Sequence, residues 1–214
     1  MLLLSLFSSS QSVSIALYKK TKLLKFQEFN FEKNQNEKIF DCIKKIFINK
    51  KLNDLSEIIF QSGPGSFTGI RSIKSIAQGI SIVTKSKIYT VNTFDIFLNQ
   101  INFENRKVIV FFCSGKQTFF YRFFKSSKKE IKPISKILFG QLDNLKNFVL
   151  SKKDHEELTL VTDNKSNLKL LDKVRGVPSV IYKLNAVSLA RAYNCGYKNE
   201  NLDIFYHHAY YEKS

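Results

Sequence analysis

The stretch SGPGSFTGIR, residues 62–71, decides the fold of this chain. It follows a short apolar run at 57–61 and leads into a segment at 69–84 whose apolar residues recur at the helical period. Glycine and proline between two such segments favour a tight turn from a strand into a helix. The stretch therefore predicts one strand–turn–helix unit of an α/β fold.

The turn has the composition of a loop that could bind an anion or a carbonyl group. Its glycines lack Cβ atoms, so they allow positive φ angles and close backbone approach. Ser66 and Thr68 supply hydroxyl groups, and Thr68 is the expected N-cap of the following helix. The first N–H groups of that helix lack partners within it. The alternative, which an arbitrary glycine-rich turn favours, is a tight crossover that binds no ligand.

Two nucleotide-binding motifs are excluded by spacing. A lysine follows the second glycine of the P-loop motif G-x-x-x-x-G-K-[ST], and none follows here. Gly65 and Gly69 are separated by one residue too many for the dinucleotide fingerprint G-x-G-x-x-G. The turn is thus neither a P-loop nor a dinucleotide-binding loop.

The segments around the turn follow the order of a mixed sheet. Three apolar or alternating runs joined by short turns predict an opening meander of strands at 2–7, 11–18 and 22–30. Helices are expected at 35–49 and 69–84, on either side of the strand at 57–61, so the order βββαβα predicts α/β architecture with helices flanking mixed sheets. Further strands are expected at 88–92, 108–113, 118–124, 131–135 and 158–162, and further helices at 93–100, 141–149 and 185–195.

A polar connector, NFENRK at 102–107, interrupts the apolar runs and marks the expected domain boundary. The chain of 214 residues is long enough for one large domain or two small lobes. We expect an N-terminal lobe at 1–104 and a smaller C-terminal lobe at 105–214.

Each of the two helices beside the turn carries a strong apolar stripe. In the first, apolar residues fall at i, i+1, i+4, i+7 and i+8, on one side of a helix. Such a stripe faces either the protein core or a partner. The stripe residues are Ile39, Phe40, Ile43, Ile46 and Phe47 in the first helix and Ile70, Ile73, Ile76, Ala77, Ile80 and Val83 in the second.

The chain is strongly basic, with a formal net charge of +16 and a pI of about 9.7. This charge favours polyanions, because lysines on phosphates release counterions. The positive charge comes mostly from Lys, mixed with many Ile and Asn. Nucleotide bias in a genome produces the same composition, and this second interpretation is preferred.

Cys42, Cys113 and Cys195 form no C-x-x-C pair, which argues against a zinc site or disulfide framework and fits a reducing cytoplasm. No apolar run approaches the about 20 residues that span a bilayer, so no membrane contact is expected.

Candidate catalytic residues are scarce, and neither a catalytic nor a metal site is expected. The three histidines, His155, His207 and His208, do not form the H-E-x-x-H pattern of a metalloprotease. No serine stands in a G-x-S-x-G elbow. The aromatic segment FYHHAYY at 205–211 could stack on RNA bases, although packing against the sheet is the preferred interpretation.

As a complete string, SGPGSFTGIR closely resembles the G-P-G-S-F-T-G-L-R signature of bacterial TsaB (YeaZ-like) proteins, of the glycoprotease-like superfamily. The resemblance is strong over residues 1–100 and weak after 105. It continues in the opening strands, in NEKIF at 36–40, IAQGI at 76–80, VNTF at 91–94 and AVSLARA at 186–192. The signature residues are Gly63, Pro64, Gly65, Ser66, Phe67, Thr68, Gly69 and Arg71.

The resemblance implies a two-lobed actin-like (ribonuclease-H-like) fold and a cytoplasmic, non-catalytic scaffold or activator. Members of the family help to make threonylcarbamoyladenosine beside the anticodon of tRNA, with the catalytic subunit TsaD and the ATPase TsaE. The resemblance implies TsaD-like and TsaE-like partners, tRNA reached indirectly, and a homodimer in isolated members. It implies no cofactor of the chain's own, and ATP or ADP at an interface with partners stays open. The implied partner interface comprises Ile39, Phe40, Ile43, Phe47, Ile70, Ile73, Ala77 and Ile80.

Two departures from the family pattern point away from chemistry in this chain. Where the family has D-T-S after its first strand, this chain has Phe7 followed by two serines, and Phe cannot ligate a hard cation. The D-A-R segment of the second lobe is replaced by Cys113, Ser114 and Gly115. The alternatives are an actin-like ATPase or glycoprotease-like metallopeptidase, and a basic RNA-binding protein.

Overall fold

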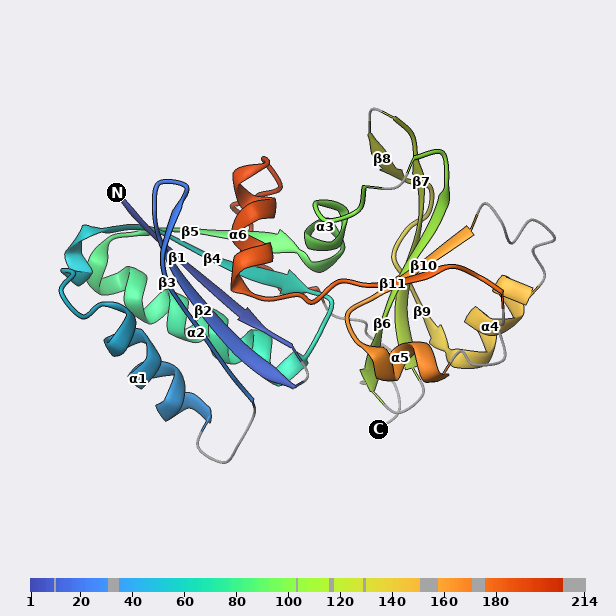
Figure 1. Cartoon of the computed structure of the whole chain (residues 1–214). Helices are drawn as coiled ribbons and strands as arrows, with labels where there is room; N and C mark the ends of the chain where they lie inside the picture. The colour runs from blue at the N-terminus through green and yellow to red at the C-terminus, as the bar shows by residue number, and fades with distance from the viewer. Residues whose placement is uncertain are drawn as a thin grey trace. The chain divides into compact units, whose positions relative to one another are not determined.

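The computed structural model divides the chain into two compact units, and each is described by itself (Figure 1). Unit 1 comprises Met1–Asn99 and the chain from Leu184 onward, and unit 2 comprises Gln100–Lys183. The residues that the structure describes are 1–9, 11–30, 35–102, 104–115, 118–128, 130–150, 158–170 and 176–205.

Unit 1 is built on a five-stranded mixed sheet in the order β3-β2-β1-β4-β5. The meander predicted from the sequence is present, because β1 (Leu2–Ser8), β2 (Ser12–Lys19) and β3 (Lys22–Asn30) pair antiparallel. The chain then crosses over twice, so that β4 (Leu55–Gly63) and β5 (Lys87–Asn92) run parallel to β1. Parallel neighbours need such crossovers, and helices supply them.

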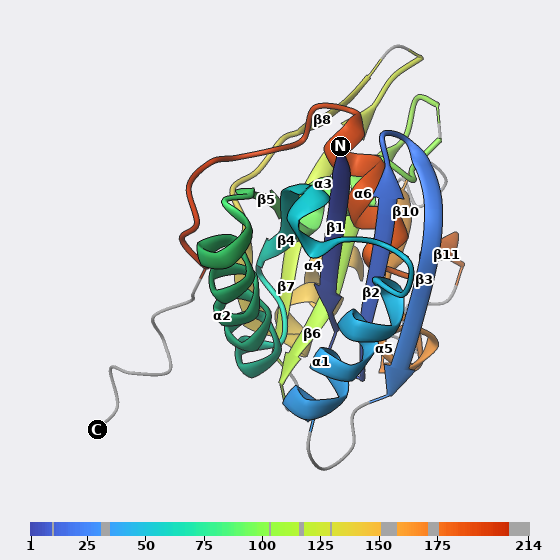
Figure 2. The ribbon, with the colours of Figure 1, turned by 90° about the vertical axis from the view of Figure 1, so that its left-hand side faces the viewer.

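Helices α1 (Gln35–Ile46) and α2 (Phe67–Thr84) make these crossovers and cover one face of the sheet (Figures 1 and 2). Successive side chains of a strand point to opposite faces, so alternate apolar residues of β1, β2 and β4 face the two helices. A short 3-10 helix, Leu52–Asp54, precedes β4. The core between the helices and the sheet is formed mainly by Leu4, Leu6, Val13, Ile15, Leu17, Ile39, Ile43, Ile46, Phe47, Ile58, Phe60, Ile73 and Ala77.

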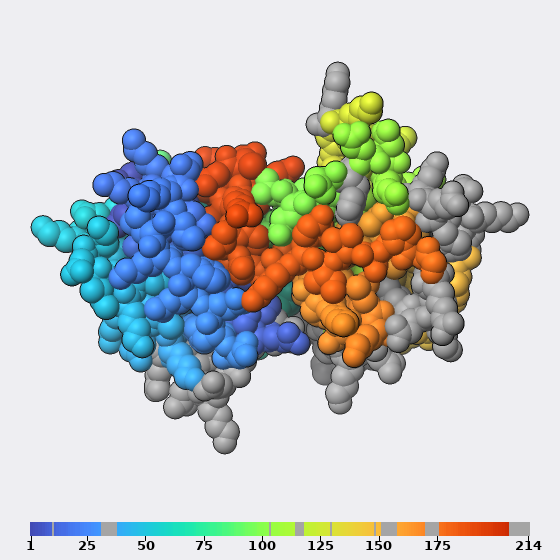
Figure 3. All heavy atoms as spheres, in the orientation of Figure 1, coloured from blue at the N-terminus to red at the C-terminus, as the bar shows by residue number. Residues whose placement is uncertain are grey.

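The opposite face of the unit 1 sheet holds α6 (Ala186–Asn194), which returns to this unit from the far end of the chain (Figure 3). The Ser5 hydroxyl donates to the Ala186 carbonyl at 2.7 Å, and the Ala186 N–H donates to the Ser14 hydroxyl at 2.8 Å. Both serines are buried. The helix begins with a capping box between Asn185 and Ser188. These bonds fix α6 on β1 and β2.

Beyond α6 the chain runs back along β5 to the glycine-rich turn. Thr90 and Asn199 exchange two backbone hydrogen bonds of 2.8 and 2.9 Å, and the Thr90 hydroxyl donates to the Asn201 carbonyl at 2.8 Å. The Phe205 N–H then donates to the Ser62 carbonyl at 2.8 Å. The segment 199–205 therefore ties the edge strand to the turn.

Unit 2 repeats the strand plan of unit 1. Its sheet has the order β11-β10-β6-β7-β8, with β9 also paired to β7. Strands β6, β7 and β8 pair antiparallel, and β10 and β11 lie parallel to β6. The strands are β6 (Lys107–Gly115), β7 (Thr118–Ser126), β8 (Ile131–Pro133), β9 (Leu138–Gln141), β10 (Leu158–Thr162) and β11 (Ser179–Ile181).

Helices α4 (Leu142–Leu150) and α5 (Lys165–Leu170) precede the parallel strands of unit 2. Leu145 and Val149 of α4 are buried against the sheet, because the helix places residues four apart on one side. The core of this unit also contains Ile109, Phe111, Phe119, Leu142, Leu158 and Leu160.

The structure differs from the predicted domain division of 1–104 and 105–214. The polar connector is followed by a second unit, but that unit ends at Lys183 and the chain from Leu184 belongs to unit 1. The physical reason is the long-range bonding of α6 to the two buried serines of β1 and β2. Two short strands, β9 and β11, the short helix α5 and the 3-10 helix Leu52–Asp54 were not predicted; the other described helices and strands lie within a few residues of the predicted ones.

Candidate functional site

The glycine-rich turn joins β4 to α2, as the sequence predicts, and two other chain segments pack on it. Gly63 has φ +98°, and a Cβ atom there would lie 3.2 Å from the Phe205 carbonyl oxygen. A Cβ atom at Gly69 would lie only 2.1 Å from the Ser8 hydroxyl oxygen. Glycine is therefore required for the left-handed backbone at the first position and for close packing of the β1–β2 turn at the second.

The N-cap of α2 is Ser66 and not Thr68, so that prediction was wrong. The Ser66 hydroxyl accepts a hydrogen bond from the Gly69 N–H at 3.4 Å, three residues into the turn. Thr68 lies inside the first helical turn, where its side chain lines the groove described below. Both residues carry hydroxyls, and the turn geometry selects the earlier one.

The β1–β2 turn, where the family resemblance would place D-T-S, is held by Gln61 of β4. The Gln61 amide oxygen accepts from the Ser8 N–H at 3.2 Å, and the amide nitrogen donates to the Ser8 carbonyl. The Phe7 side chain is 3% exposed and points into the protein. The site thus has an apolar ring in the place of a carboxylate, and Ser8 packs against the start of α2.

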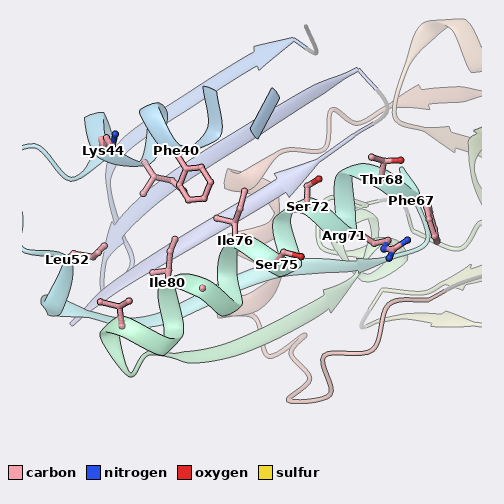
Figure 4. A pocket seen from close by; sticks show the side chains of 13 residues that line it. Phe40, Lys44, Leu52, Phe67, Thr68, Arg71, Ser72, Ser75, Ile76 and Ile80 are labelled. Carbon is pink, nitrogen blue, oxygen red and sulfur yellow. The ribbon is translucent and has the colours of Figure 1, made fainter. Parts of the chain in front are cut away.

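A groove of about 690 Å³ lies between α1 and α2 on the outer side of unit 1 (Figure 4). Figure 4 shows Phe40 of α1 pointing across it toward Ile76 and Ile80 of α2. Small residues of α2, Ser75 and Gly79, leave the groove open. The remaining lining residues are Ile43, Lys44, Leu52, Phe67, Thr68, Arg71, Ser72 and Val83.

The groove exposes apolar surface that the core does not use. Phe40 is 48% exposed and Val83 is 69% exposed, whereas Ile43 and Ile76 on the floor are each 7% exposed. Large apolar residues that gather in one concave patch mark an interaction site more often than scattered ones do. The groove is therefore the candidate functional site of unit 1.

The predicted partner interface is only partly accessible, which corrects the sequence-based assignment. Most of its residues lie in the core, because the stripe of each helix faces the sheet. Of the eight predicted residues, Phe40 and Ile80 line the groove and Ile43 forms part of its floor. The residues that are buried away from the groove are Ile39, Phe47, Ile70, Ile73 and Ala77.

Several groove residues were not predicted as interface. Val83 was placed on the apolar stripe, but it lies at the stripe's outer border and is exposed. Leu52 belongs to the 3-10 helix, which the sequence did not reveal. The spacing of Ser75 and Gly79, four residues apart on α2, was the available signal, because small residues at this spacing let another helix approach closely.

The rim of the groove is basic. Lys44 lies on α1, and the Arg71 guanidinium carbon lies 5.0 Å from the centroid of the Phe67 ring, within range of a cation–π contact. None of the described lining residues is acidic. A partner that carries carboxylates beside an apolar surface fits this rim.

The ionisable groups with raised pKa values away from the groove include Tyr193 of α6 and Asp163 of unit 2. Burial, and then the neighbouring Glu57 carboxylate that accepts its hydrogen bond, raise the pKa of Tyr193 on α6. In unit 2, burial raises the pKa of the Asp163 carboxyl above its ordinary value, although hydrogen bonds from Thr162, Asn167 and Asn164 lower it. Asp163 makes these bonds within its own turn.

Within the described ranges, no three His, Cys, Asp or Glu side chains come together as metal ligands. His155, His207 and His208, and all of the segment 205–211 beyond Phe205, lie outside the described residues. The cysteines are free thiols and lie on different elements. Of the helices that the structure describes, none combines the length and the apolar character that crossing a membrane requires.

Comparison with known proteins adds a family to this geometry. The family described as "TsaD: tRNA N6-adenosine threonylcarbamoyltransferase" matches residues 30–170. A Buchnera aphidicola (subsp. Schizaphis graminum) protein named tRNA threonylcarbamoyladenosine biosynthesis protein TsaB is 34% identical over 113 residues, which are 51% of this chain and 53% of the relative. The TsaB protein of Buchnera aphidicola subsp. Acyrthosiphon pisum is 31% identical over 61% of this chain and 60% of its own length.

The solved structures agree on the fold. YeaZ from Pseudomonas aeruginosa aligns with a TM-score of 0.70 at 15% identity, over 96% of this chain and 99% of that one. A second Pseudomonas aeruginosa structure, described as similar to peptidase YeaZ, aligns with a TM-score of 0.71 at 16% identity, over 95% of this chain and 98% of that one. The chain therefore has the two-lobed, actin-like α/β fold expected from the sequence. The sequence matches span little more than half the length of the curated TsaB relatives. The family match covers well over half of this chain, so the chain belongs to the TsaD family, and it is similar to TsaB and YeaZ proteins.

Proposed function

We propose that this chain is a non-catalytic scaffold or activator subunit in the threonylcarbamoyladenosine modification of tRNA. It acts with a TsaD-like catalytic subunit and a TsaE-like ATPase, and its groove binds helices of the TsaD-like subunit. The relatives named for threonylcarbamoyladenosine biosynthesis support the process. The groove between α1 and α2 is the single observation that supports the role of the chain in it.

The form of the groove suits a helical partner. The exposed side chains of Phe40 on α1 and Val83 on α2 line the groove together with small and apolar residues. An amphipathic helix, or a helix pair, can place its ridge in such a groove. The same surface could pair with a second copy of this chain, so a homodimer is the resting state we expect without the partner.

The alternative of catalysis by the chain itself receives less support from the site. A Mg²⁺-nucleotide site of the actin-like type needs an acid at the end of the first strand, and Phe7 is a buried ring there. Ser8 and the start of α2 are also in direct contact, since a single Cβ atom at Gly69 would overlap the Ser8 hydroxyl. Any ATP or ADP is therefore assigned to an interface with the partners.

The experiment that tests this proposal is reconstitution with matched variants. The chain should switch on tRNA modification by the TsaD-like and TsaE-like proteins, and it should co-purify with the first of them. Val83→Asp should lose both, because a carboxylate would be buried in the interface, whereas Ile82→Asp should retain them. Val83 is 69% and Ile82 70% exposed, they are neighbours on α2, and of the two Val83 lines the groove.

Substitution of the buried Ile43 or Ile73 is not a clean test, because a charge in the core would unfold unit 1. A folded Val83→Asp variant that binds the TsaD-like subunit as tightly as the wild-type chain would contradict the groove assignment. Turnover of ATP by the isolated chain, dependent on Mg²⁺, would contradict the non-catalytic role.

A further inference from the structure

Two short segments of unit 1 hold an unusual share of the chain's positive charge. Residues 19–25 and 44–51 contain eight lysines in fifteen residues and no aspartate or glutamate. All eight side chains belong to exposed residues. We call this surface the lysine patch, and it consists of Lys19, Lys20, Lys22, Lys25, Lys44, Lys45, Lys50 and Lys51.

In the folded chain the two segments lie side by side and form one surface. The first segment is the β2–β3 hairpin at the free edge of the sheet, and the second is the end of α1 with the chain that follows it. The Lys25 ammonium donates to the Lys45 carbonyl at 3.1 Å, which joins them. Figure 2 shows the chain after α1 passing beside β3.

The patch concentrates like charges at close range. Lys19 and Lys22 stand directly opposite each other in the antiparallel ladder, an arrangement that destabilises a sheet. Lys44 of the patch forms an ion pair with Asp41 at 3.9 Å, and the two side chains are 80% and 64% exposed. Solvent screens such a pair strongly. The potential of the patch is therefore available to an external anion.

The residue types favour a nucleic-acid backbone over an acidic protein. The patch contains lysine alone, without arginine, and protein–protein interfaces are depleted of lysine and enriched in arginine. Lysine acts as a mobile point charge toward phosphates and does not need the bidentate geometry that arginine provides. On the same edge strand, Leu23 is 42% exposed and Phe26 is 37% exposed, so an aromatic face is open beside the charges.

We infer that the lysine patch is a direct RNA-contact surface of this chain. It binds the sugar–phosphate backbone through charge and without base-specific readout. The lysine patch shares only Lys44 with the lining of the apolar groove, so RNA on the other seven lysines leaves the groove open to a protein partner. That the RNA is tRNA rests on the proposed function; the binding itself is a property of the isolated chain.

The test is fluorescence anisotropy of a labelled tRNA transcript with the purified full chain, over a salt series from about 25 to 200 mM. The test variant combines Lys22→Glu with Lys50→Glu and so replaces one lysine in each segment of the patch. Lys128→Glu combined with Lys136→Glu makes the same change in net charge on exposed lysines of unit 2. We expect the double variant of Lys22 and Lys50 to bind tRNA about tenfold more weakly at low salt, and to lower the slope of log K against log salt by about 2. The double variant of Lys128 and Lys136 should change the affinity less than twofold.

Equal losses in the two double variants would overturn the inference, because the affinity would then reflect net charge alone. Binding of vesicles with anionic lipids, together with no measurable tRNA binding, would assign the patch to a membrane and also overturn it. Thermal unfolding by circular dichroism verifies that both double variants are folded. A failure here leaves co-purification with the TsaD-like subunit unaffected, so it is distinguishable from a failure of the proposed function.

Discussion

The same substitution at two glycines of α2 should change stability in opposite directions. Gly79 lies in the middle of the helix, and a Cβ atom there would have no neighbour within 4 Å. Alanine removes backbone entropy from the unfolded chain, so Gly79→Ala should raise the free energy of unfolding by about 0.5–1 kcal/mol. For a unit of this size that corresponds to roughly 2–4 °C in Tm.

Gly69→Ala should lower the stability although it is also a change to a better helix former. The new Cβ atom would lie 2.1 Å from the Ser8 hydroxyl oxygen and 3.0 Å from the Ser8 Cβ. Overpacking of this kind costs about 1–3 kcal/mol, which exceeds the gain in helix propensity. We expect a net loss of about 1–2 kcal/mol.

The assay is thermal and urea unfolding of the full chain, followed by far-ultraviolet circular dichroism and by tyrosine fluorescence, since the chain contains no tryptophan. Ser8→Ala removes the closest atom, so the cost of Gly69→Ala should fall by at least half in that background, which a double-mutant cycle measures. If Gly69→Ala stabilised the chain as Gly79→Ala does, the β1–β2 turn could not be packed on α2 as described.

Three further outcomes are expected. Phe40→Ala should weaken binding of the TsaD-like subunit roughly thirtyfold in a titration, because about half of an aromatic surface of roughly 200 Å² would lose its burial, worth about 2 kcal/mol. Ser5→Ala should cost about 1–3 kcal/mol in urea unfolding, since it leaves the buried Ala186 carbonyl without its donor, and a smaller loss would contradict the bond. The pKa of Tyr193 is higher in the folded chain than in the unfolded chain. Its contribution to the free energy of unfolding is therefore complete below the ordinary tyrosine pKa near 10 and is lost as the pH rises further. Tyr193→Phe, which also removes the bond to Glu57, should therefore flatten the fall of Tm above pH 10, and an unchanged slope would refute the assignment.

Local patterns predicted the helices and strands of unit 1 because its apolar periodicity is strong. The stripe of α1 follows the helical period, and β1 is buried along its whole length, so each element follows from its own residues. The weakly patterned strand β11 depends on pairing with β10, and the short helix α5 depends on packing against the same strand. Periodicity carries no information about such pairing.

The site was less predictable than the fold, for a related reason. A stripe shows that one side of a helix is apolar, and it does not show whether the sheet or a partner covers that side. Ile39 and Ile73 are buried in the core, while Phe40, which follows Ile39 in α1, is 48% exposed. The return of α6 could not be predicted either, because Ser5 and Ala186 are 181 residues apart in the chain.

The bond between Ser5 and Ala186 also has a consequence for synthesis on the ribosome. Unit 2 is a contiguous segment and can collapse as soon as it has left the exit tunnel. Unit 1 begins first, yet the face of its sheet that receives α6 stays open, and Ser5 and Ser14 lack their partner Ala186, until residues beyond 184 have emerged. The lobe made first is thus completed last, and a nascent chain stalled within unit 2 would present an uncovered sheet to chaperones.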